Sequence, residues 1–140
     1  MIKKRTPVSA IMSRNLITAD VNSSLRHVNS LLKEHNIRHL PVVSGKKLVG
    51  IISKTDILRL SFGDMFEGQK DADEAVFDML KLEQVMVSRP IVVAEDQSIK
   101  DVAEKFTQVD FHAMPVVNGE ELTGMVSTTD LIKYLLEQYN

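Results

Sequence analysis

The chain has no cysteine and no tryptophan, and only 5% of its 140 residues are aromatic. The absence of cysteine excludes a disulfide framework, a zinc–thiolate site and a cysteine nucleophile. No apolar run approaches the roughly 20 residues of a membrane-spanning helix, and no hydrophobic segment follows the basic residues Lys3–Arg5 as it would in a signal peptide. We therefore expect a soluble, cytoplasmic protein with no membrane partner.

The charges are divided unevenly along the chain. Residues 1–60 carry 11 Lys and Arg against 3 Asp and Glu, a net +8, whereas residues 61–140 carry 6 against 16, a net −10. The basic residues are scattered through an ordinary hydrophobic pattern without aromatic side chains for base stacking, which disfavours nucleic acid as a partner. The split favours attraction between the two halves, within one chain or between two chains.

The chain contains an internal repeat. A gapless shift of 74 residues places Met12 on Met86, Gly50 on Gly124 and Asp56 on Asp130, and it superimposes Pro41–Val43 on Pro115–Val117. A register that holds over about fifty residues indicates a duplicated unit. Each copy is too small to bury much by itself, so the two copies should form one α/β module with pseudo-twofold symmetry.

Both copies predict the same order of strand, helix, strand, strand and helix. We place the first repeat at residues 8–60 and the second at residues 82–137. The expected elements are first strands at Leu16–Thr18 and Ile91–Val93, a helix from near Ser23-Ser24 with a partner over Ile99–Phe106, hairpins turning at Ser44-Gly45 and Asn118-Gly119, and second helices from Ser53 to about Leu60 and from Ser127 to about Glu137. Asn36 and Asp110 follow the first helices, where a left-handed C-terminal cap is expected.

Residues 61–81 have no counterpart in the repeat. They are acidic and predict a loop followed by a short amphipathic helix, with Val76, Phe77 and Leu80 facing inward. Two interpretations stay open for this connector. It is either a solvated link between the repeats or a lid over a ligand.

Several motifs recur in the same order in both repeats. They are Ser9–Met12 and Glu83–Met86, Leu40–Val43 and Met114–Val117, and the pattern Gly-x-x-Ser-x-x-Asp at Gly50–Asp56 and Gly124–Asp130. Taken together they resemble a tandem pair of cystathionine β-synthase (CBS) domains, also called a Bateman module, over roughly Val8 to Tyr134. The resemblance implies a regulatory module that binds an adenosine-containing ligand between its repeats, such as AMP, ADP, ATP or S-adenosylmethionine, and signals to an effector protein. It implies no required cofactor and no metal.

The resemblance also implies roles for individual residues. Asp56 and Asp130 would bind the ribose hydroxyls, and a carboxylate suits that task because it offers two acceptor oxygens. The phosphate or nucleotide contacts would come from Ser53, Thr55, Ser127, Thr129, Arg38, His39, His112 and Lys54. The adenine slot would be lined by Ile11, Met12, Val42, Val85, Met86 and Val116. In that family the segment ahead of one repeat packs on the other repeat's junction, so Val8–Ser13 would serve Asp130 and Val85–Val87 would serve Asp56.

The same Ser and Asp residues have a purely structural interpretation. Ser-x-x-Asp at a helix start is close to a capping box, with Ser53 or Ser127 as the N-cap. An Asp in the first turn also stabilises a helix through its dipole by about 0.3–1 kcal/mol. Ribose binding and capping therefore both remain open for Asp56 and Asp130.

No motif indicates catalysis. The chain has no Gly-rich phosphate loop, no paired histidines at metal spacing and no nucleophile beside a base, so we expect no enzyme activity. The alternative to a ligand sensor is a structural dimerisation module with non-functional nucleotide sites. Modules of the resembling family pair into discs, and the charge split favours an antiparallel homodimer in which the first repeat of one chain meets the second repeat of its mate.

Overall fold

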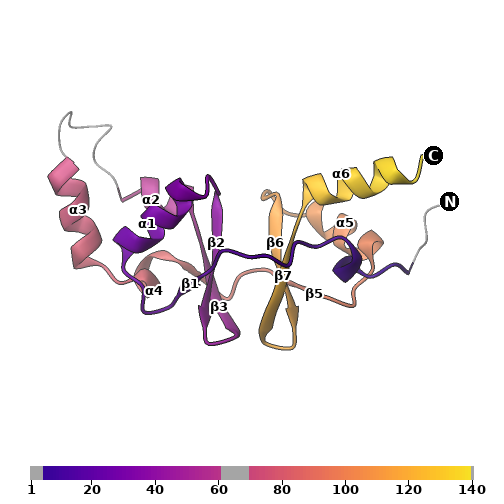
Figure 1. The fold of residues 1–140 in the computed structure, drawn as a ribbon, viewed down its shortest axis with the longest axis horizontal. Helices are drawn as coiled ribbons and strands as arrows, with labels where there is room; N and C mark the ends of the chain where they lie inside the picture. Colours follow the sequence, from indigo (N-terminus) through magenta and orange to yellow (C-terminus); the bar gives the residue numbers. More distant parts are fainter. Residues whose placement is uncertain (1–4, 61–69, 140) are drawn as a thin grey trace. The chain divides into compact units, whose positions relative to one another are not determined.

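The computed structural model describes residues 5–60 and 70–139. The chain divides into two compact units, each a mixed α/β structure (Figure 1). Residues 17–90 form the first unit, and the described residues up to Leu16 join those from Ile91 onward in the second unit. The predicted order of strand, helix, strand, strand and helix is confirmed in both units.

The first unit is built on a small sheet. Its elements are β1 (Ala19–Asp20), α1 (Leu25–Glu34), β2 (His39–Ser44), β3 (Lys47–Ser53), α2 (Lys54–Leu58), α3 (Lys70–Met79), α4 (Leu82–Val85) and β4 (Val87–Ser88). Strand β1 runs parallel to β2, and β3 runs antiparallel to both β2 and β4. The helix α4 and the strand β4 were not expected from the sequence.

The second unit repeats this plan. Its elements are the 3-10 helix η1 (Val8–Ala10), β5 (Val93–Ala94), α5 (Ile99–Phe106), β6 (Ala113–Asn118), β7 (Glu121–Ser127) and α6 (Thr128–Glu137). Strand β5 runs parallel to β6, and β6 runs antiparallel to β7. The register of β6 with β7 repeats that of β2 with β3 pair for pair, which is what the gapless sequence repeat predicts.

The first helix of each repeat forms where its capping residue and its apolar spacing agree. Ser24 and Ser98 accept the backbone N–H three residues on, at 3.1 Å in each case. Behind these caps lie buried stripes, Leu25, Val28 and Leu32 in α1 and Ile99, Val102 and Phe106 in α5. These stripes face the strands and form the centre of each unit's core.

Four expectations about boundaries need correction. The first strands begin three and two residues later than predicted, at Ala19 and Val93, because these are the residues in register with Val42 and Val116 in the middle of β2 and β6. Ser44 is the last residue of β2 and pairs with Lys47, and Asn118 is the last residue of β6 and pairs with Glu121. The turns therefore begin one residue later than predicted, at Gly45 and Gly119, each with φ 63°. Helix α2 is shorter than expected and ends at Leu58.

The fourth correction concerns the caps after the first helices. Asn36 adopts the left-handed conformation, with φ 51°, as predicted. Asp110 does not, since Asn36 and Arg89 are the non-glycine residues with positive φ in the described part of the chain. Helix α5 instead ends at Phe106 in a turn stabilised by the Thr107 hydroxyl, which donates to the Glu104 carbonyl oxygen at 2.6 Å.

Helix α3 packs against the first unit through its C-terminal half. Phe77 is buried in the core of the unit, and Leu80 packs beside it. On the surface, Arg26 of α1 donates two hydrogen bonds to the Asp78 carboxylate at 2.8 and 2.7 Å. These bonds hold the pKa of Asp78 below its ordinary value. The predicted loop at residues 61–69 lies outside the described residues.

Candidate functional site

The two Gly-x-x-Ser-x-x-Asp motifs form two equivalent strand-to-helix junctions. In the first unit Ser53 Oγ accepts the Asp56 N–H at 3.1 Å, and Asp56 Oδ2 accepts the Ser53 N–H at 2.9 Å. In the second unit the corresponding distances are 3.1 Å to Ser127 Oγ and 2.8 Å to Asp130 Oδ2. Both junctions are therefore complete capping boxes.

Capping occupies only part of each motif. The box uses Oδ2 of the aspartate and a lone pair of the serine Oγ, so the serine hydroxyl hydrogen and the aspartate Oδ1 are available to other groups. Asp56 Oδ1 lies 3.8 Å from the Arg59 guanidinium. Within the described residues, Asp130 Oδ1 makes no hydrogen bond or ion pair. The two junctions have the same backbone geometry but differ in the surroundings of the carboxylate Oδ1, the oxygen that a ligand would meet.

A strap crosses each junction from the segment ahead of the other repeat. Ser13 exchanges two backbone hydrogen bonds with Met125 of β7, at 2.8 and 3.0 Å. In the first unit β4 pairs with β3 so that Val87 lies opposite Ile51. The segments Val8–Ser13 and Val85–Val87 thus belong to the units of Asp130 and Asp56 respectively, which is the pairing that the family resemblance implies.

The motif glycine explains how close each strap lies. A Cβ placed on Gly124 would stand 2.5 Å from the Met12 sulfur and 2.9 Å from the Ser13 carbonyl oxygen. At Gly50 it would stand 2.5 Å from the Met86 sulfur. Real Cβ atoms do not approach so near, so these positions require glycine for contact rather than for backbone conformation.

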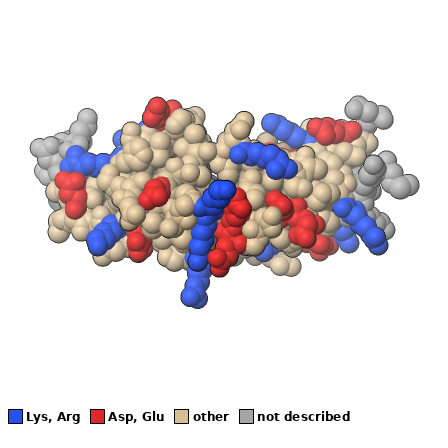
Figure 2. Space-filling model, turned by 60° about the horizontal axis from the view of Figure 1, so that its bottom comes forward, with Lys and Arg blue, Asp and Glu red and all other residues tan. Residues whose placement is uncertain are grey.

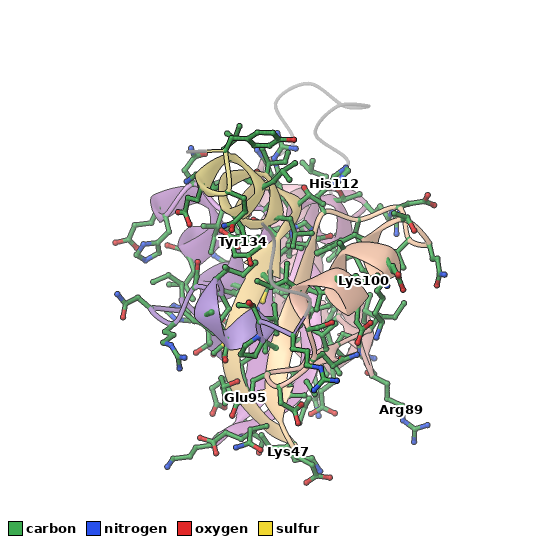
Figure 3. All side chains as sticks on the ribbon, turned by 90° about the vertical axis from the view of Figure 1, so that its right-hand side faces the viewer. Lys47, Arg89, Glu95, Lys100, His112 and Tyr134 are labelled. Carbon is green, nitrogen blue, oxygen red and sulfur yellow. The ribbon has the colours of Figure 1, made fainter. Side chains whose placement is uncertain are left out.

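The predicted basic residues do not gather around Asp56. Arg38 and Lys54 line a groove between α1 and α2, and Asp56 is not among its lining residues. His39 is half-buried and paired with Ser53 in the β2–β3 register. His112 is exposed and lies at the end of the second unit where α6 is drawn, with Tyr134, whereas Glu95 lies at the other end (Figure 3).

The predicted adenine residues fall into two groups. Val42 and Val116 have no exposed surface and belong to the cores, so they offer nothing to a ligand in this conformation. Ile11, Val85 and Met86 are half-buried, and Met12 is 8% exposed. The straps therefore carry the adenine candidates that border the surface.

The surface charges are mixed. On the face shown in Figure 2, Lys and Arg side chains and Asp and Glu side chains both occur over each unit. In the part of the chain that the structure describes, no group of three or more His, Asp or Glu could hold a metal ion, and no helix is long and apolar enough to cross a membrane.

Sequence reasoning missed two features of these junctions. The strap residue Ser13 holds Met125 through its backbone, which side-chain motifs do not reveal. Arg59 approaches Asp56, and its spacing of three residues on a helix was a signal that could have found it.

Comparison with known proteins agrees with this geometry. The family model of the CBS domain matches residues 8–63 and 82–137. The uncharacterised protein MJ1404 of Methanocaldococcus jannaschii is 32% identical over 145 residues, covering 97% of this chain and 33% of that protein. The chain spans a third to a half of the length of the first curated relatives it matches.

Solved structures show the same fold. Protein MJ1225 from Methanocaldococcus jannaschii is 28% identical with a TM-score of 0.81, over 96% of this chain and 49% of that one. The CBS domain pair of protein MJ0100, in complex with 5′-methylthioadenosine and S-adenosyl-L-methionine, is 29% identical with a TM-score of 0.72, over 95% and 98% of the two chains. With both repeats matched in sequence and in fold, this chain belongs to the CBS domain family and carries a tandem pair of its domains.

Proposed function

We propose that the protein is a non-catalytic regulatory module that binds an adenosine-containing ligand, such as AMP, ADP, ATP or S-adenosylmethionine, and signals to a partner protein. The ribose hydroxyls donate to Asp130 in the second unit and to Asp56 in the first. Ser127 and Thr129, with Ser53 and Thr55 in the first unit, supply hydroxyl donors for the rest of the ligand.

The observation that carries this proposal is the unused oxygen of Asp130. The side chain is half-buried and is fixed by its capping bond to Ser127, while its Oδ1 meets no partner among the described residues. A carboxylate oxygen held in this way accepts a hydroxyl proton in a charge-assisted bond. At Asp56 the guanidinium of Arg59 competes for the same oxygen, so the Asp130 junction binds more tightly.

Two further observations support an adenosyl ligand. The CBS domain pair of protein MJ0100, which this chain resembles along nearly its whole length, was solved with two adenosyl compounds. In this chain the half-buried Ile11 of the strap packs against the core of the unit that holds Asp130 and offers an apolar surface to a base.

The test is a thermal-shift panel of AMP, ADP, ATP, S-adenosylmethionine, NAD and cyclic dinucleotides. At a concentration a hundred times its Kd, a ligand of the folded state adds about 2.7 kcal/mol of stability, or roughly 8–12 °C in melting temperature. No shift from any adenosyl compound at millimolar concentration would overturn the proposal.

A matched pair of variants locates the site. Asp130→Asn keeps an oxygen for the cap but removes the charge, and it should weaken binding at least tenfold. Asp101→Asn makes the same change at the same helical position of α5, where the Asp101 N–H donates to Ser98 at 3.1 Å. Asp130→Asn should lose somewhat more stability, because the Asp130 carboxylate also accepts the Ser127 N–H while α5 has no such reciprocal bond, but only Asp130→Asn should lose the ligand response. Equal losses of response would place the ligand elsewhere.

A structural dimerisation module is the second candidate, and helix α6 favours it. None of its residues is buried. Leu131 and Tyr134 lie half-buried on the side of its own unit. Its remaining apolar residues, Ile132, Leu135 and Leu136, are exposed by 57%, 42% and 62%, and Tyr139, just beyond the helix end, is exposed by 77%. They follow the spacing i, i+3, i+4, i+7 of one helical face, which we call the α6 stripe.

We propose that a second copy of the chain covers the α6 stripe in an antiparallel homodimer. Leu58 of α2 corresponds to Ile132 in the repeat and is also exposed, by 55%. Helix α2 with its C-cap carries Lys54 and Arg59 against Asp56, whereas α6 carries Asp130 and Glu137 against Lys133, and these opposite net charges favour α2 of one chain against α6 of the other. The two candidates are compatible, and the ligand panel separates a sensing dimer from a purely structural one.

A further inference from the structure

A small cavity in the first unit lies where the chain between α3 and α4 passes the turn between β1 and α1. Its volume is about 280 Å³. We call residues Leu80–Glu83 the link and residues Val21–Ser24 the turn, and these two segments supply its lining. Neither Ser53 nor Asp56 is among the lining residues, so the cavity is separate from the proposed ribose contacts.

The second unit joins the same two segments through their backbones. The counterparts of the link and the turn are Thr6–Ser9 and Glu95–Ser98, 74 positions away in the repeat. Three hydrogen bonds hold them together, from the Val8 N–H to the Gln97 carbonyl oxygen at 2.7 Å, from the Ser9 N–H to the Glu95 carbonyl oxygen at 3.2 Å and from the Ile99 N–H to the Thr6 carbonyl oxygen at 2.9 Å. The cavity of the first unit therefore occupies the place where the second unit has paired backbone.

The three equivalent hydrogen bonds are absent from the described part of the first unit. Leu25 and Leu82 are 0% and 1% exposed, yet neither backbone N–H has an acceptor among the described residues. A buried N–H without an acceptor is rare in native proteins, because the loss of its hydration is not compensated. Joining the link to the turn, as in the second unit, would give both groups an acceptor.

Helix α3 explains why the link stands away from the turn. Only Leu80 and Lys81 separate α3 from α4, so the end of α3 fixes where α4 begins. Phe77 of α3 is buried in the core of the unit, and the Asp78 carboxylate accepts two hydrogen bonds from Arg26. Arg26 directly follows Leu25, so α3 is held at the first turn of α1, beside an N–H that lacks an acceptor.

The second unit has no corresponding restraint. Lys100, the counterpart of Arg26, pairs with Glu104 of its own helix at 3.6 Å. The described residues ahead of η1 form no helix that would correspond to α3. The segment that is joined to its turn is thus the one that no docked helix holds back.

We propose that the link of the first unit has an open and a closed state, and that docked α3 holds it open. In the closed state the Leu82 N–H donates to the Ser23 carbonyl oxygen and the Leu25 N–H donates to the Leu80 carbonyl oxygen. Release of α3 exchanges its core and ion-pair contacts for these backbone hydrogen bonds, so the two states lie close in free energy. Because α4 leads directly into Val85–Val87, the state of the link alters how the strap lies over the Asp56 junction. Only a consequence for ligand binding there rests on the proposed function.

The test is disulfide trapping in the full chain, which contains no cysteine of its own. Pro7 and Ser98 form an antiparallel bridge between two of the hydrogen bonds of the second unit. The Cα atoms of such a pair are about 4.5 Å apart, within the range of a disulfide, so Pro7→Cys with Ser98→Cys should oxidise readily. Lys81→Cys with Ser24→Cys is the equivalent pair and meets only when the link closes. It should oxidise at least about tenfold more slowly while α3 is docked.

Release of α3 should remove this difference. With Phe77→Ala and Asp78→Asn added, the pair at positions 24 and 81 should oxidise about tenfold faster, because a buried aromatic side chain and a bidentate ion pair hold α3 in place. The pair at positions 7 and 98 should keep its rate, which reports an intact fold. If that control slows, Asp78→Asn alone replaces the double change. A first-unit pair that does not oxidise after release, or that oxidises equally fast with and without docked α3, overturns the proposal.

Amide hydrogen exchange followed by NMR tests the open state without cysteines. In the wild type, the Leu25 and Leu82 amides should exchange at least about tenfold faster than those of Ile99 and Val8, because only the latter donate to carbonyl oxygens. Asp78→Asn should narrow the difference. Equal protection in the wild type would show a link that is already closed and would overturn the proposal. Both experiments omit adenosyl ligands, so their failure is distinguishable from failure of the proposed function.

Discussion

Asp130 and Asp56 each have two carboxylate oxygens with different surroundings. Oδ2 completes the helix cap through the serine N–H, at 2.8 and 2.9 Å respectively. Oδ1 is the oxygen that remains, and among the described residues a cation approaches it only at Asp56. Capping and ribose binding are therefore compatible on one side chain. The two interpretations that the sequence left open are not exclusive.

Glycine at position 124 determines how closely the strap can lie. We expect Gly124→Ala to lower the free energy of unfolding by about 1–3 kcal/mol, because the new methyl group meets the Met12 sulfur and the Ser13 carbonyl oxygen. Urea unfolding measures the loss. In a Met12→Ala background the cost should fall, since the sulfur contact is absent. Strictly additive losses would show that Met12 does not oppose the methyl group.

At the scale of the element, much could be predicted from the sequence. The repeat order, the two capped helices α1 and α5 and both hairpins follow from Ser24, Ser98 and the paired Gly45 and Gly119. These residues act on neighbours only a few positions away, so the sequence alone is enough to identify the elements that they begin or connect. The two-residue strands, such as β1 at Ala19–Asp20, were misplaced because two residues have no periodicity to detect.

The chemistry of the site was less predictable. The family resemblance assigns Arg38, Lys54 and Asp56 to the same ligand. Which of these side chains meet depends on the direction in which each one leaves the backbone, and for Lys54 and Asp56 on their positions around the five-residue helix α2. Lys33, which shares the groove with Arg38 and Lys54, comes from the previous helix and has no motif to mark it. A short motif does not tell which face of one helix packs against which face of another, and that packing decides which side chains share a groove.

The contact between α1 and α3 should depend on pH. Two hydrogen bonds from Arg26 hold the pKa of Asp78 below its ordinary value, so the carboxylate stays charged to lower pH in the folded state than in the unfolded state. The contribution to stability is therefore present above an ordinary carboxyl pKa of about 4 and is lost as the pH falls through the lowered value.

The measurement compares melting temperatures of wild type and Asp78→Asn. Wild type should be the more stable at pH 7, and the difference should shrink as the pH falls below the ordinary carboxyl pKa of about 4 and through the lowered value of Asp78. Asp96→Asn, on an exposed turn of the second unit, is the control and should change little at either pH. A wild-type advantage that persists unchanged at acid pH would refute the ion pair as its source.

At the scale of the whole molecule, the α6 stripe predicts self-association. Leu136→Glu places a charge among the three other exposed apolar side chains of the stripe and should convert a dimer to a monomer, as measured by sedimentation equilibrium, without loss of the core. Met79→Glu is the matched control, because Met79 is 80% exposed on α3 and lies off the stripe. A dimer that survives Leu136→Glu, or a wild type that is monomeric at all concentrations, contradicts the prediction.

Salt provides an independent reading of the same assembly. If the net positive α2 and the net negative α6 meet across the interface, raising the ionic strength from about 0.05 to 0.5 M should weaken the dimer as the charges are screened. A parallel arrangement places α2 on α2 and α6 on α6, so like charges meet and the dimer should respond in the opposite direction. The sign of the salt effect therefore reports the orientation of the two chains.

The exchange of the two straps has a consequence for the origin of the chain. The repeated sequence begins with its strap, yet each strap lies in the unit of the other repeat. A single ancestral copy would thus have lacked the strap for its own junction unless a sister molecule supplied it. Such a copy would have been complete only as a pair of molecules that exchanged their straps, before the two copies of the gene were fused. A gene that encodes residues 17–90 would keep the first unit together with its strap, whereas a cut at the repeat boundary would separate each strap from the junction that it covers.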